Sequence, residues 1–433
     1  MRTIDLRGRA LTPAELLATV PRAAEARAAA LAAAAEIVSD VRDRGEASLR
    51  EQAERFDRVT GHAVRVPSEH IAEAIDGLDP AVRGALESAI ARVREASAAQ
   101  VPPARVTELA DGARVSQRWQ PVSRVGVYVP GGKAVYPSSV VMNVVPAQIA
   151  GVASLALASP PQADQDGRVH PTILAAAGLL GVDEVYAMGG AGAIGAFAYG
   201  VDALGLDPVD LVTGPGNNFV ASAKRAVAGV VGTDSEAGAT EILISADETA
   251  DARHVAYDLV SQAEHDEQAS AVLVTDSPEL AQAVEAEVER VAAATRHAER
   301  VSVALGGPQS AIVLVDDAAA AERFSNAYAP EHLELHLADA AEAAARYTSA
   351  GAVFVGAYSP VSLGDYLAGS NHVLPTGGQS RYAAGLGAAT FLRSQQVIEY
   401  SRDALAEVSD AIVALAQAEA LPAHGEAVTA RFA

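Results

Sequence analysis

The sequence contains no cysteine among its 433 residues. A chain without cysteine forms no disulfide bonds, offers no thiolate ligands to a metal and holds no iron–sulfur cluster. It also lacks the thiol through which many enzymes oxidise an aldehyde as a covalent thiohemiacetal. The chemistry of this protein must therefore depend on oxygen and nitrogen side chains.

Basic residues are scarce relative to acidic ones. The 32 Lys and Arg residues face 55 Asp and Glu residues, which gives a formal net charge of −23. Nucleic acids and anionic membranes bind surfaces rich in Lys and Arg, so we expect neither as a partner. Half of the residues are hydrophobic, and a chain of this length is expected to fold into about three domains.

The beginning of the sequence also lacks the apolar segment of a secretory signal, because Met1–Ala10 carries several charged residues. One long stretch, Ala134–Ala163, contains no charge, but prolines interrupt it. These prolines would break a single membrane-spanning helix, so the stretch predicts a buried helix followed by a buried strand. We expect a soluble, cytoplasmic protein.

The first hundred residues have the pattern of helices. Thr12-Pro13-Ala14-Glu15 is a capping box with proline at the first helical position. An Ala-rich helical segment, Arg22–Phe56, is expected to break near Gly45, and Ser68–Gly77 and Pro80–Gln100 continue the helical pattern.

After about Arg124, short β-branched runs alternate with helix-length segments, a pattern that predicts parallel βαβ units. The predicted strands form two series: Arg124–Val129, Ala153–Ala158, Glu184–Met188 and Val209–Thr213, then Glu241–Ser245, Ser270–Thr275, Ala311–Val315 and Ala352–Val355. The fold class is therefore α/β, with two doubly wound domains. From about Gln379 the sequence predicts a loop, the helix Arg402–Glu419 and an end piece, Leu421–Ala433. Such a tail often packs on a second subunit.

Three glycine-rich segments follow predicted strands in the first series: GVYVPGG (Gly126–Gly132), GGAGAIGAFAYG (Gly189–Gly200) and TGPGNNFV (Thr213–Val220). Glycine lets backbone N–H groups approach phosphates, and three such loops favour a nucleotide site. Gly190, Gly192 and Gly195 also have the G-x-G-x-x-G spacing, but the acidic residue expected further on, Asp210, falls inside a predicted strand.

Without cysteine, a metal site needs His, Asp, Glu or amide ligands. Gln262 and His265, in SQAEHD, are three positions apart at a predicted helix end, where both side chains face one way, although an ordinary polar helix end explains them as well. Glu331 and His332, in NAYAPEHLE, could form an acid–base pair, but neighbours in a strand usually point to opposite faces. Three further candidates, Asp365, His372 and His424, lie in polar loops, and the other histidines, His336 included, have ordinary surface or core contexts.

The motifs GVYVPGG, GPGN, SQAEHD, NAYAPEHLE, GDYLAGSNHVLPT and LPAHGEAV occur in an order and spacing that resembles the histidinol dehydrogenase family. The resemblance covers essentially the whole chain. It implies a zinc-dependent homodimer that oxidises L-histidinol through an aldehyde to L-histidine with two NAD⁺, the last steps of histidine biosynthesis.

Carried over residue by residue, the resemblance assigns a role to each member of the site. Glu331 and His332 become the acid–base pair, and Tyr128 and Asn217 would contact NAD⁺. The implied zinc ligands are Gln262, His265, Asp365 and His424, and the implied substrate-binding residues are these four together with Thr240, His332, His372 and Glu419.

The resemblance also implies an organisation into Rossmann-like domains. It predicts an N-terminal arm (1–27), a discontinuous α/β domain (28–123 with 237–378), a cofactor-side domain (124–236) and a tail (379–433) that is swapped in a homodimer. The N-terminal helices would then pack on the later α/β half. Two positions depart from the family pattern: Gly192 stands where many members have glutamine, and Ala239 stands where proline is usual. Both affect loops near the cofactor or substrate.

Oxidising an alcohol to an acid takes two hydride transfers with water added between them. Because no cysteine is available, water must attack the aldehyde, and Glu331 suits that activation, while His332 suits the role of general base. Zinc would position the substrate. Two alternatives remain at this point: a paralogue acting on another small polar alcohol, such as a sulfonated diol, and a non-catalytic metal-binding remnant.

Overall fold

The computed structural model describes residues 1–22, 24–131, 134–235 and 238–433. Gly132 of the first glycine-rich segment, Glu236 and the expected domain boundary at 236/237 lie outside the described residues. The chain divides into two compact units, which are described separately. The large unit comprises Met1–Gln100 and Val122–Phe391, and the small unit comprises Val101–Pro121 and Leu392–Ala433.

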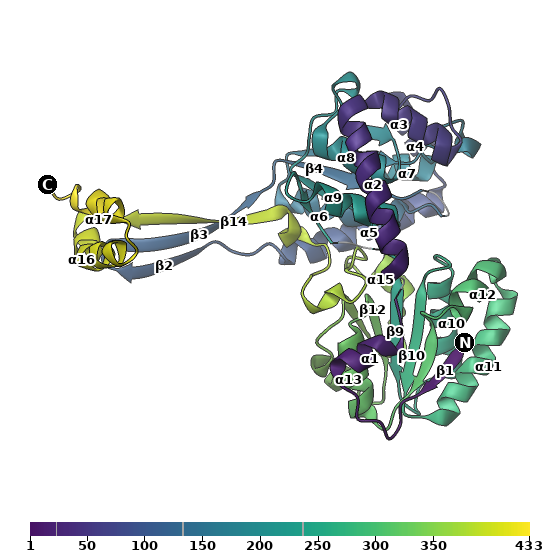
Figure 1. Ribbon diagram of the computed structural model, residues 1–433. Helices are drawn as coiled ribbons and strands as arrows, with labels where there is room; N and C mark the ends of the chain where they lie inside the picture. Colours follow the sequence, from purple (N-terminus) through teal and green to yellow (C-terminus); the bar gives the residue numbers. More distant parts are fainter. Residues whose placement is uncertain (23, 132–133, 236–237) are drawn as a thin grey trace. The chain divides into compact units, whose positions relative to one another are not determined.

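The first sheet of the large unit has five parallel strands in the order β6–β5–β4–β7–β8. Figure 1 shows its strand β4 among the helices of this half. Its strands are β4 (Arg124–Tyr128), β5 (Ser154–Ser159), β6 (Val185–Ala187), β7 (Leu211–Thr213) and β8 (Gly232–Thr233). They alternate with α6 (Pro137–Ala150), α7 (Pro171–Leu179), α8 (Gly190–Tyr199) and α9 (Asn218–Val227). The strand order reverses between β4 and β7, and doubly wound sheets bind ligands beyond the strand ends at this switch point. The uncharged stretch forms α6 and β5, as predicted.

The second sheet has six parallel strands in the order β1–β11–β10–β9–β12–β13. Its strands are β1 (Arg2–Asp5), β9 (Glu241–Ala246), β10 (Ser270–Thr275), β11 (Ala311–Leu314), β12 (His332–His336) and β13 (Ala352–Val355). The accompanying helices are α10 (Ala252–Ala263), α11 (Pro278–Ala294), α12 (Ala298–Gly306), α13 (Ala318–Tyr328), α14 (Ala340–Ala343) and α15 (Val361–Tyr366). Apart from β1, which the sequence did not predict, this sheet repeats the order of the first, with its own switch point between β9 and β12.

The N-terminal segment contributes to both halves of the large unit. After the predicted capping box at Thr12, α1 (Pro13–Thr19) packs against α13. The following helices are α2 (Ala24–Arg44), α3 (Glu46–Gln52), a π-helical turn (Ala53–Asp57), α4 (Ser68–Asp76) and α5 (Pro80–Ala99). The break between α2 and α3 falls at Gly45, whose φ of 54° ends the helix.

The expectation that the N-terminal helices pack on the later half is wrong for α2, α4 and α5, although α1 does contact α13 of that half. Helix α2 packs on α8 and α9, α4 packs on α7, and α5 packs on α6, so they cover helices of the first sheet. The physical reason is close contact between small residues: Gly195 of α8 lies against the backbone of Val38 in α2. Within the described residues, we find no helix whose length and apolar character would suit a bilayer crossing.

The small unit contains an antiparallel sheet in the order β14–β3–β2 and two helices. Its elements are β2 (Arg105–Ala110), β3 (Ala113–Pro121), β14 (Leu392–Tyr400), α16 (Arg402–Ala418) and α17 (Pro422–Thr429). The tail helix is close to its predicted bounds, but β14 replaces part of the predicted loop. Few side chains of the tail helix α16 are buried within the chain, namely those of Ala404, Ser409 and Ala416.

Candidate active site

The three glycine-rich segments meet at the carboxyl ends of β4, β6 and β7. Tyr128 ends β4, and its buried hydroxyl accepts a hydrogen bond from the backbone N–H of Gly190 (3.1 Å). Burial raises the pKa of Tyr128 to about 12, so the phenol stays neutral. Gly214 has a φ of 115° and lies so close to the Tyr128 carbonyl that a β-carbon would overlap it. The backbone of all three loops therefore surrounds the switch point of the first sheet.

A buried ion pair holds the third loop in place. Lys224 on α9 pairs with Asp234, and the two side chains are 1% and 3% exposed. Lys224 donates to the carbonyl of Gly214, and Asp234 accepts from the Gly214 N–H at 2.9 Å. These two hydrogen bonds hold both the carbonyl and the N–H of Gly214, which has a left-handed backbone conformation. Sequence patterns alone did not identify this pair, because its members lie ten positions apart in different elements.

Asn217, the second residue expected to contact NAD⁺, caps α9. Its side-chain oxygen accepts from the N–H groups of Phe219 (3.0 Å) and Val220 (3.2 Å), and the residue is exposed at the loop. Asp210, in contrast, accepts from the N–H groups of Ser123 and Arg124. Because these residues begin β4, Asp210 lies at the amino edge of the sheet and not in the nucleotide crevice.

The G-x-G-x-x-G spacing lies within and not before a helix, since Gly190, Gly192 and Gly195 all belong to α8. A β-carbon on Gly192 would overlap the side-chain amide of Gln52, which extends from α3. Gln52 itself donates to Ser48 at 2.9 Å. The space that a side chain at position 192 would occupy is therefore already filled.

We expect Gly192→Gln to lower the free energy of unfolding by about 0.5–1.5 kcal/mol, because the flexible end of Gln52 must move aside and then loses its hydrogen bond to Ser48. Removing the obstructing amide in Gln52→Ala should recover most of this loss in the double variant. Denaturant unfolding of the two single variants and the double variant measures the coupling. If the free-energy changes of the two single variants add up to that of the double variant, the proposed overlap is contradicted.

The candidate acid–base pair lies at the amino edge of the second sheet. Glu331 immediately precedes β12, and its Oε2 accepts from the Thr240 hydroxyl (2.6 Å) and from the backbone N–H of Glu241 (2.9 Å). His332 begins β12, and its Nδ1–H donates to the Glu241 carbonyl (3.1 Å). The two side chains approach each other, with Glu331 Oε2 and His332 Nδ1 3.5 Å apart. Strand alternation does not separate them, because Glu331 lies outside the strand.

These contacts determine the tautomer of His332 and influence the pKa of Glu331. A carbonyl oxygen only accepts, so His332 carries its proton on Nδ1 and leaves Nε2 free to accept another. Burial raises the pKa of Glu331 to about 7, and the nearby His332 opposes part of that rise. A carboxyl that titrates near neutrality can both take and return a proton at physiological pH.

Gln262, at the end of α10, joins the same network. It is 2% exposed, and its Nε2 donates to the Thr240 hydroxyl (2.7 Å), which in turn donates to Glu331. The amide oxygen of Gln262 remains available as a ligand. Thr240 thus connects the expected ligand Gln262 with the acid–base pair.

His265, Asp365 and His372 lie within electrostatic range of one another and of His332. The Nδ1–H of His372 donates to the backbone carbonyl of Asp365 (3.0 Å), and its Nε2 lies 3.2 Å from the Ser139 hydroxyl on α6. Burial lowers the pKa of both His265 and His372, so their rings are neutral near pH 7. Neutral imidazole is the form that binds a metal.

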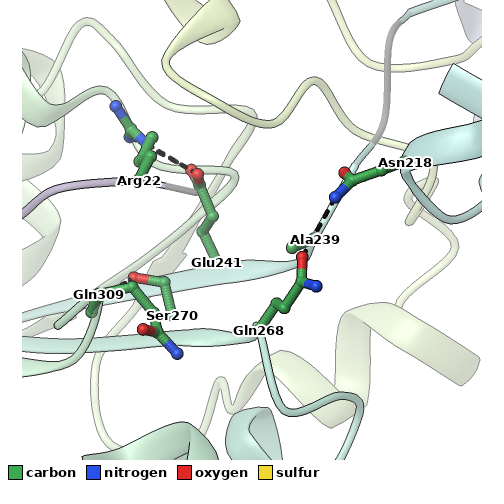
Figure 2. A pocket seen from close by; sticks show the side chains of 7 residues that line it. All are labelled: Arg22, Asn218, Ala239, Glu241, Gln268, Ser270 and Gln309. Atoms are coloured by element: carbon green, nitrogen blue, oxygen red, sulfur yellow. Dashed lines mark hydrogen bonds and ion pairs between the residues drawn. The ribbon is translucent and has the colours of Figure 1, made fainter. Parts of the chain in front are cut away.

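Arg22 and Glu241 support this edge of the sheet, and sequence analysis did not single them out. The Arg22 guanidinium pairs with Glu241 at 2.7 Å and donates to the Tyr328 carbonyl at 2.6 Å. Figure 2 shows this pair in a small cavity with Ala239, the second departure from the family pattern. Because the Glu241 backbone contacts both Glu331 and His332, the buried Arg22 pair fixes the strand that aligns them.

Glu419 and His424 belong to the small unit. Glu419 caps the carboxyl end of α16, and His424 lies in α17. Both side chains are exposed. The large unit brings together the other expected site residues, in two groups at the edges of its two sheets: Tyr128 and Asn217 at the first, and Thr240, Gln262, His265, Glu331, His332, Asp365 and His372 at the second.

Comparisons with known proteins identify the family. The family profile described as histidinol dehydrogenase matches residues 20–432. Histidinol dehydrogenase of Leifsonia xyli subsp. xyli is 66% identical over 432 residues, covering 100% of this chain and 99% of that protein. The protein of the same name from Nocardia farcinica is 58% identical, covering 99% of this chain and 97% of its own length.

A solved structure has the same fold. The crystal structure of histidinol dehydrogenase from Elizabethkingia anophelis superposes with a TM-score of 0.91 at 31% identity, covering 100% of this chain and 98% of that one. A full-length match in sequence and in fold, together with the acid–base pair and the glycine-rich crevice, leads to one conclusion. The chain belongs to the histidinol dehydrogenase family.

Proposed function

We propose that this NAD-dependent oxidoreductase converts L-histidinol to L-histidine through L-histidinaldehyde, with two NAD⁺ and one zinc ion per subunit. The observation that carries the proposal is the hydrogen-bonded series Gln262–Thr240–Glu331 beside His332, in a chain without cysteine. Neither the other-alcohol paralogue nor the non-catalytic remnant is favoured by relatives of this identity.

The residues present fit a zinc ion. The Gln262 amide is oriented with its oxygen free, His265 is neutral, and Asp365 supplies a carboxylate near both rings. We assign these three as ligands, with His424 as the fourth. When bound, zinc would orient the substrate's amine and imidazole, and NAD⁺ in the first-sheet crevice, near Tyr128 and Asn217, would accept the hydride.

The residues of the chain account for the proton transfers. His332 Nε2 accepts the hydroxyl proton in each oxidation, because the Glu241 carbonyl holds its Nδ1–H and fixes the ring. Glu331 takes a proton from the water that attacks the aldehyde carbon, and the proton that His332 holds after the first oxidation passes to the aldehyde oxygen. The hydrated diol then forms without a thiol, and His332 Nε2 is free for the second oxidation. Thr240, His372 and Glu419, with the ligand residues, would hold the substrate.

We further propose that the protein is a homodimer in which the tail crosses to the partner. The exposure of Glu419 and His424 and the few buried residues of α16 support this. The resemblance implies an arm 1–27, domains 28–123 with 237–378 and 124–236, and a tail 379–433, and we revise this division for the N-terminal helices. Packing of α2, α4 and α5 on α6–α9 favours grouping those helices with 124–236 instead.

The stoichiometry of the reaction tests the function. Each histidinol should yield two NADH without release of free aldehyde, and a chelator should abolish the activity until zinc is restored. The measurement is NADH absorbance at limiting histidinol, with an aldehyde-trapping reagent present. One NADH per histidinol, with the aldehyde captured, would overturn the proposal.

The role of Glu331 predicts a pH dependence of the aldehyde half-reaction. Glu331 must be ionised to activate water, and its pKa is about 7. The rate with synthetic histidinaldehyde should therefore fall as pH drops below about 7, by close to tenfold per unit. Glu331→Gln should slow this half-reaction more than alcohol oxidation and remove the dependence, whereas equal losses in both halves would contradict the division of roles.

A further inference from the structure

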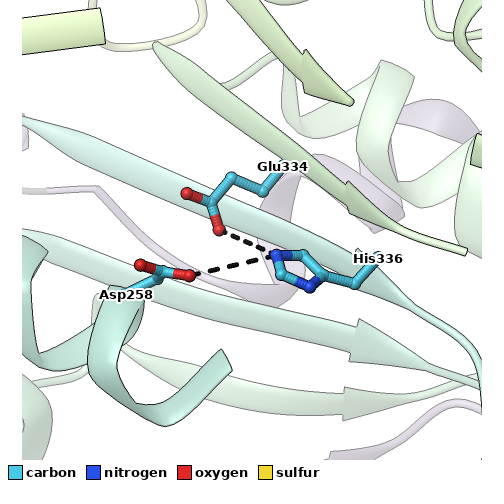
Figure 3. Close-up of side chains that lie close together, drawn as sticks. All are labelled: Asp258, Glu334 and His336. Atoms are coloured by element: carbon cyan, nitrogen blue, oxygen red, sulfur yellow. Dashed lines mark hydrogen bonds and ion pairs between the residues drawn. The ribbon is translucent and has the colours of Figure 1, made fainter. Parts of the chain in front are cut away.

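A second group of metal-ligating side chains lies at the opposite edge of the second sheet. His332, Glu334 and His336 share one face of β12, because side chains alternate along a strand. Asp258 of α10 faces Glu334 and His336, as Figure 3 shows. His336 Nε2 lies 3.3 Å from Glu334 Oε2 and 3.9 Å from Asp258 Oδ2. The group is buried: Glu334 is 0% exposed and His336 is 5% exposed.

The place of this group in the fold points to a ligand. His336 ends β12, and β12 and β9 flank the switch point of the second sheet, where doubly wound sheets bind ligands. An open surface cleft of about 560 Å³ reaches Asp258 there. Its other lining residues are Asp251, Arg253, His254, Tyr257, Ala357 and Pro360. In this sheet the candidate catalytic residues occupy the amino edge, so the crevice at the carboxyl edge has no part in the proposed reaction.

The carboxylates of the group face one basic side chain. Two carboxylates are packed together, and no Lys or Arg in the described ranges forms an ion pair with either of them. The ring nitrogen Nε2 of His336 faces both. A bound divalent cation would neutralise the two carboxylates and take this nitrogen as a ligand.

The donor geometry is already set. Glu334 Oε1 accepts from the Val361 N–H at 2.8 Å, which directs Oε2 towards His336. The Nε2 of His336 is the ring nitrogen that faces the two carboxylates, and its Nδ1 is buried without a partner among the described residues. Tetrahedral zinc with bonds of 2.0–2.1 Å requires ligand atoms about 3.4 Å apart. The observed 3.3 and 3.9 Å are close to this spacing.

We propose that Asp258, Glu334 and His336 bind a divalent transition-metal ion of the zinc class, with the fourth position open to the cleft. The site is distinct from that of Gln262, His265 and Asp365, because β12 separates His332 from His336 by four residues, about 13 Å. The ion links α10 to β12. This inference does not depend on the proposed function.

Metal stoichiometry of the full chain tests it. The chelated protein is dialysed against Zn²⁺, and bound zinc is counted by mass spectrometry. We expect two equivalents per chain in the parent, the one zinc of the proposed reaction and one at this group, with one equivalent in His265→Ala, one in Asp258→Asn and none in the double variant. The Asp258→Asn change is isosteric, and Glu334→Gln serves as a second test should it fold poorly by circular dichroism.

His254→Gln is the matched control, because His254 lines the same cleft outside the group, and it should retain two equivalents. A zinc count in folded Asp258→Asn and Glu334→Gln equal to that of the parent would overturn the inference. A failure of the catalytic zinc assignment would be recognisable separately, since His265→Ala would then bind as much zinc as the parent.

Discussion

His332→Ala should lower kcat for histidinol by about 10²–10⁴-fold, the usual contribution of a positioned general acid–base group. The loss should affect both the alcohol and the aldehyde substrate, because the proposed mechanism has His332 Nε2 accept a proton in each oxidation. Steady-state rates with each substrate measure it, and His254→Gln, an exposed histidine at the opposite edge of the same sheet, is the control. A loss confined to one substrate would show that a different base serves the other step.

The same variant, paired with His424→Ala, tests whether the tail crosses between subunits. Each variant should be inactive alone. In a mixed dimer with exchanged tails, one site receives both lesions and the other receives neither. When the two variants are unfolded together and refolded as an equal mixture, about a quarter of all sites should be intact by counting over random pairs.

Activity of the refolded mixture, compared with the refolded parent, measures this fraction. If His424 served its own subunit, every site would carry one lesion and mixing would restore nothing. Native mass spectrometry establishes that heterodimers form. Heterodimers without recovered activity would refute the crossed tail.

A second substitution with a large expected effect changes the buried pair Lys224–Asp234. Lys224→Met should reduce the free energy of unfolding by about 3–5 kcal/mol, because it leaves a buried carboxylate and the Gly214 carbonyl without their partner. Asp234 would then take up a proton on folding. A folded state that binds more protons than the unfolded state loses stability as pH rises, so the deficit should be larger at pH 8 than at pH 5.

Denaturant unfolding at the two pH values measures the deficit. The exposed pair Arg114–Glu399 provides a matched control, and Arg114→Met should change stability very little because solvent screens that pair. The Michaelis constant for NAD⁺ should also rise in Lys224→Met, since Gly214 belongs to the cofactor crevice. A deficit no larger than that of Arg114→Met would contradict the role of the buried pair.

Much of the fold follows from local pattern. Strands such as β4 and β10 and the helices between them were predicted within a few residues, because apolar runs, glycine-rich turns and caps such as Thr12 act over short distances. The strand β14 was missed because its mostly exposed side chains give no apolar alternation. Its partner in the sheet, β3, is nearly 300 residues away.

For the candidate site, too, one part follows from the sequence and another part from the tertiary structure. Its residue types and the motifs that carry them are a property of the sequence, and the absence of cysteine by itself excludes a covalent thiohemiacetal. Only the tertiary structure decided which of these residues meet and at which edge of each sheet they lie. Glu331 and His332 approach each other because Glu331 lies just outside the strand and both contact Glu241. The Lys224–Asp234 pair and the contact between Asp258 and β12 join separate elements, and burial sets the pKa of Glu331. Burial and long-range contacts depend on packing between distant segments, which no local pattern encodes.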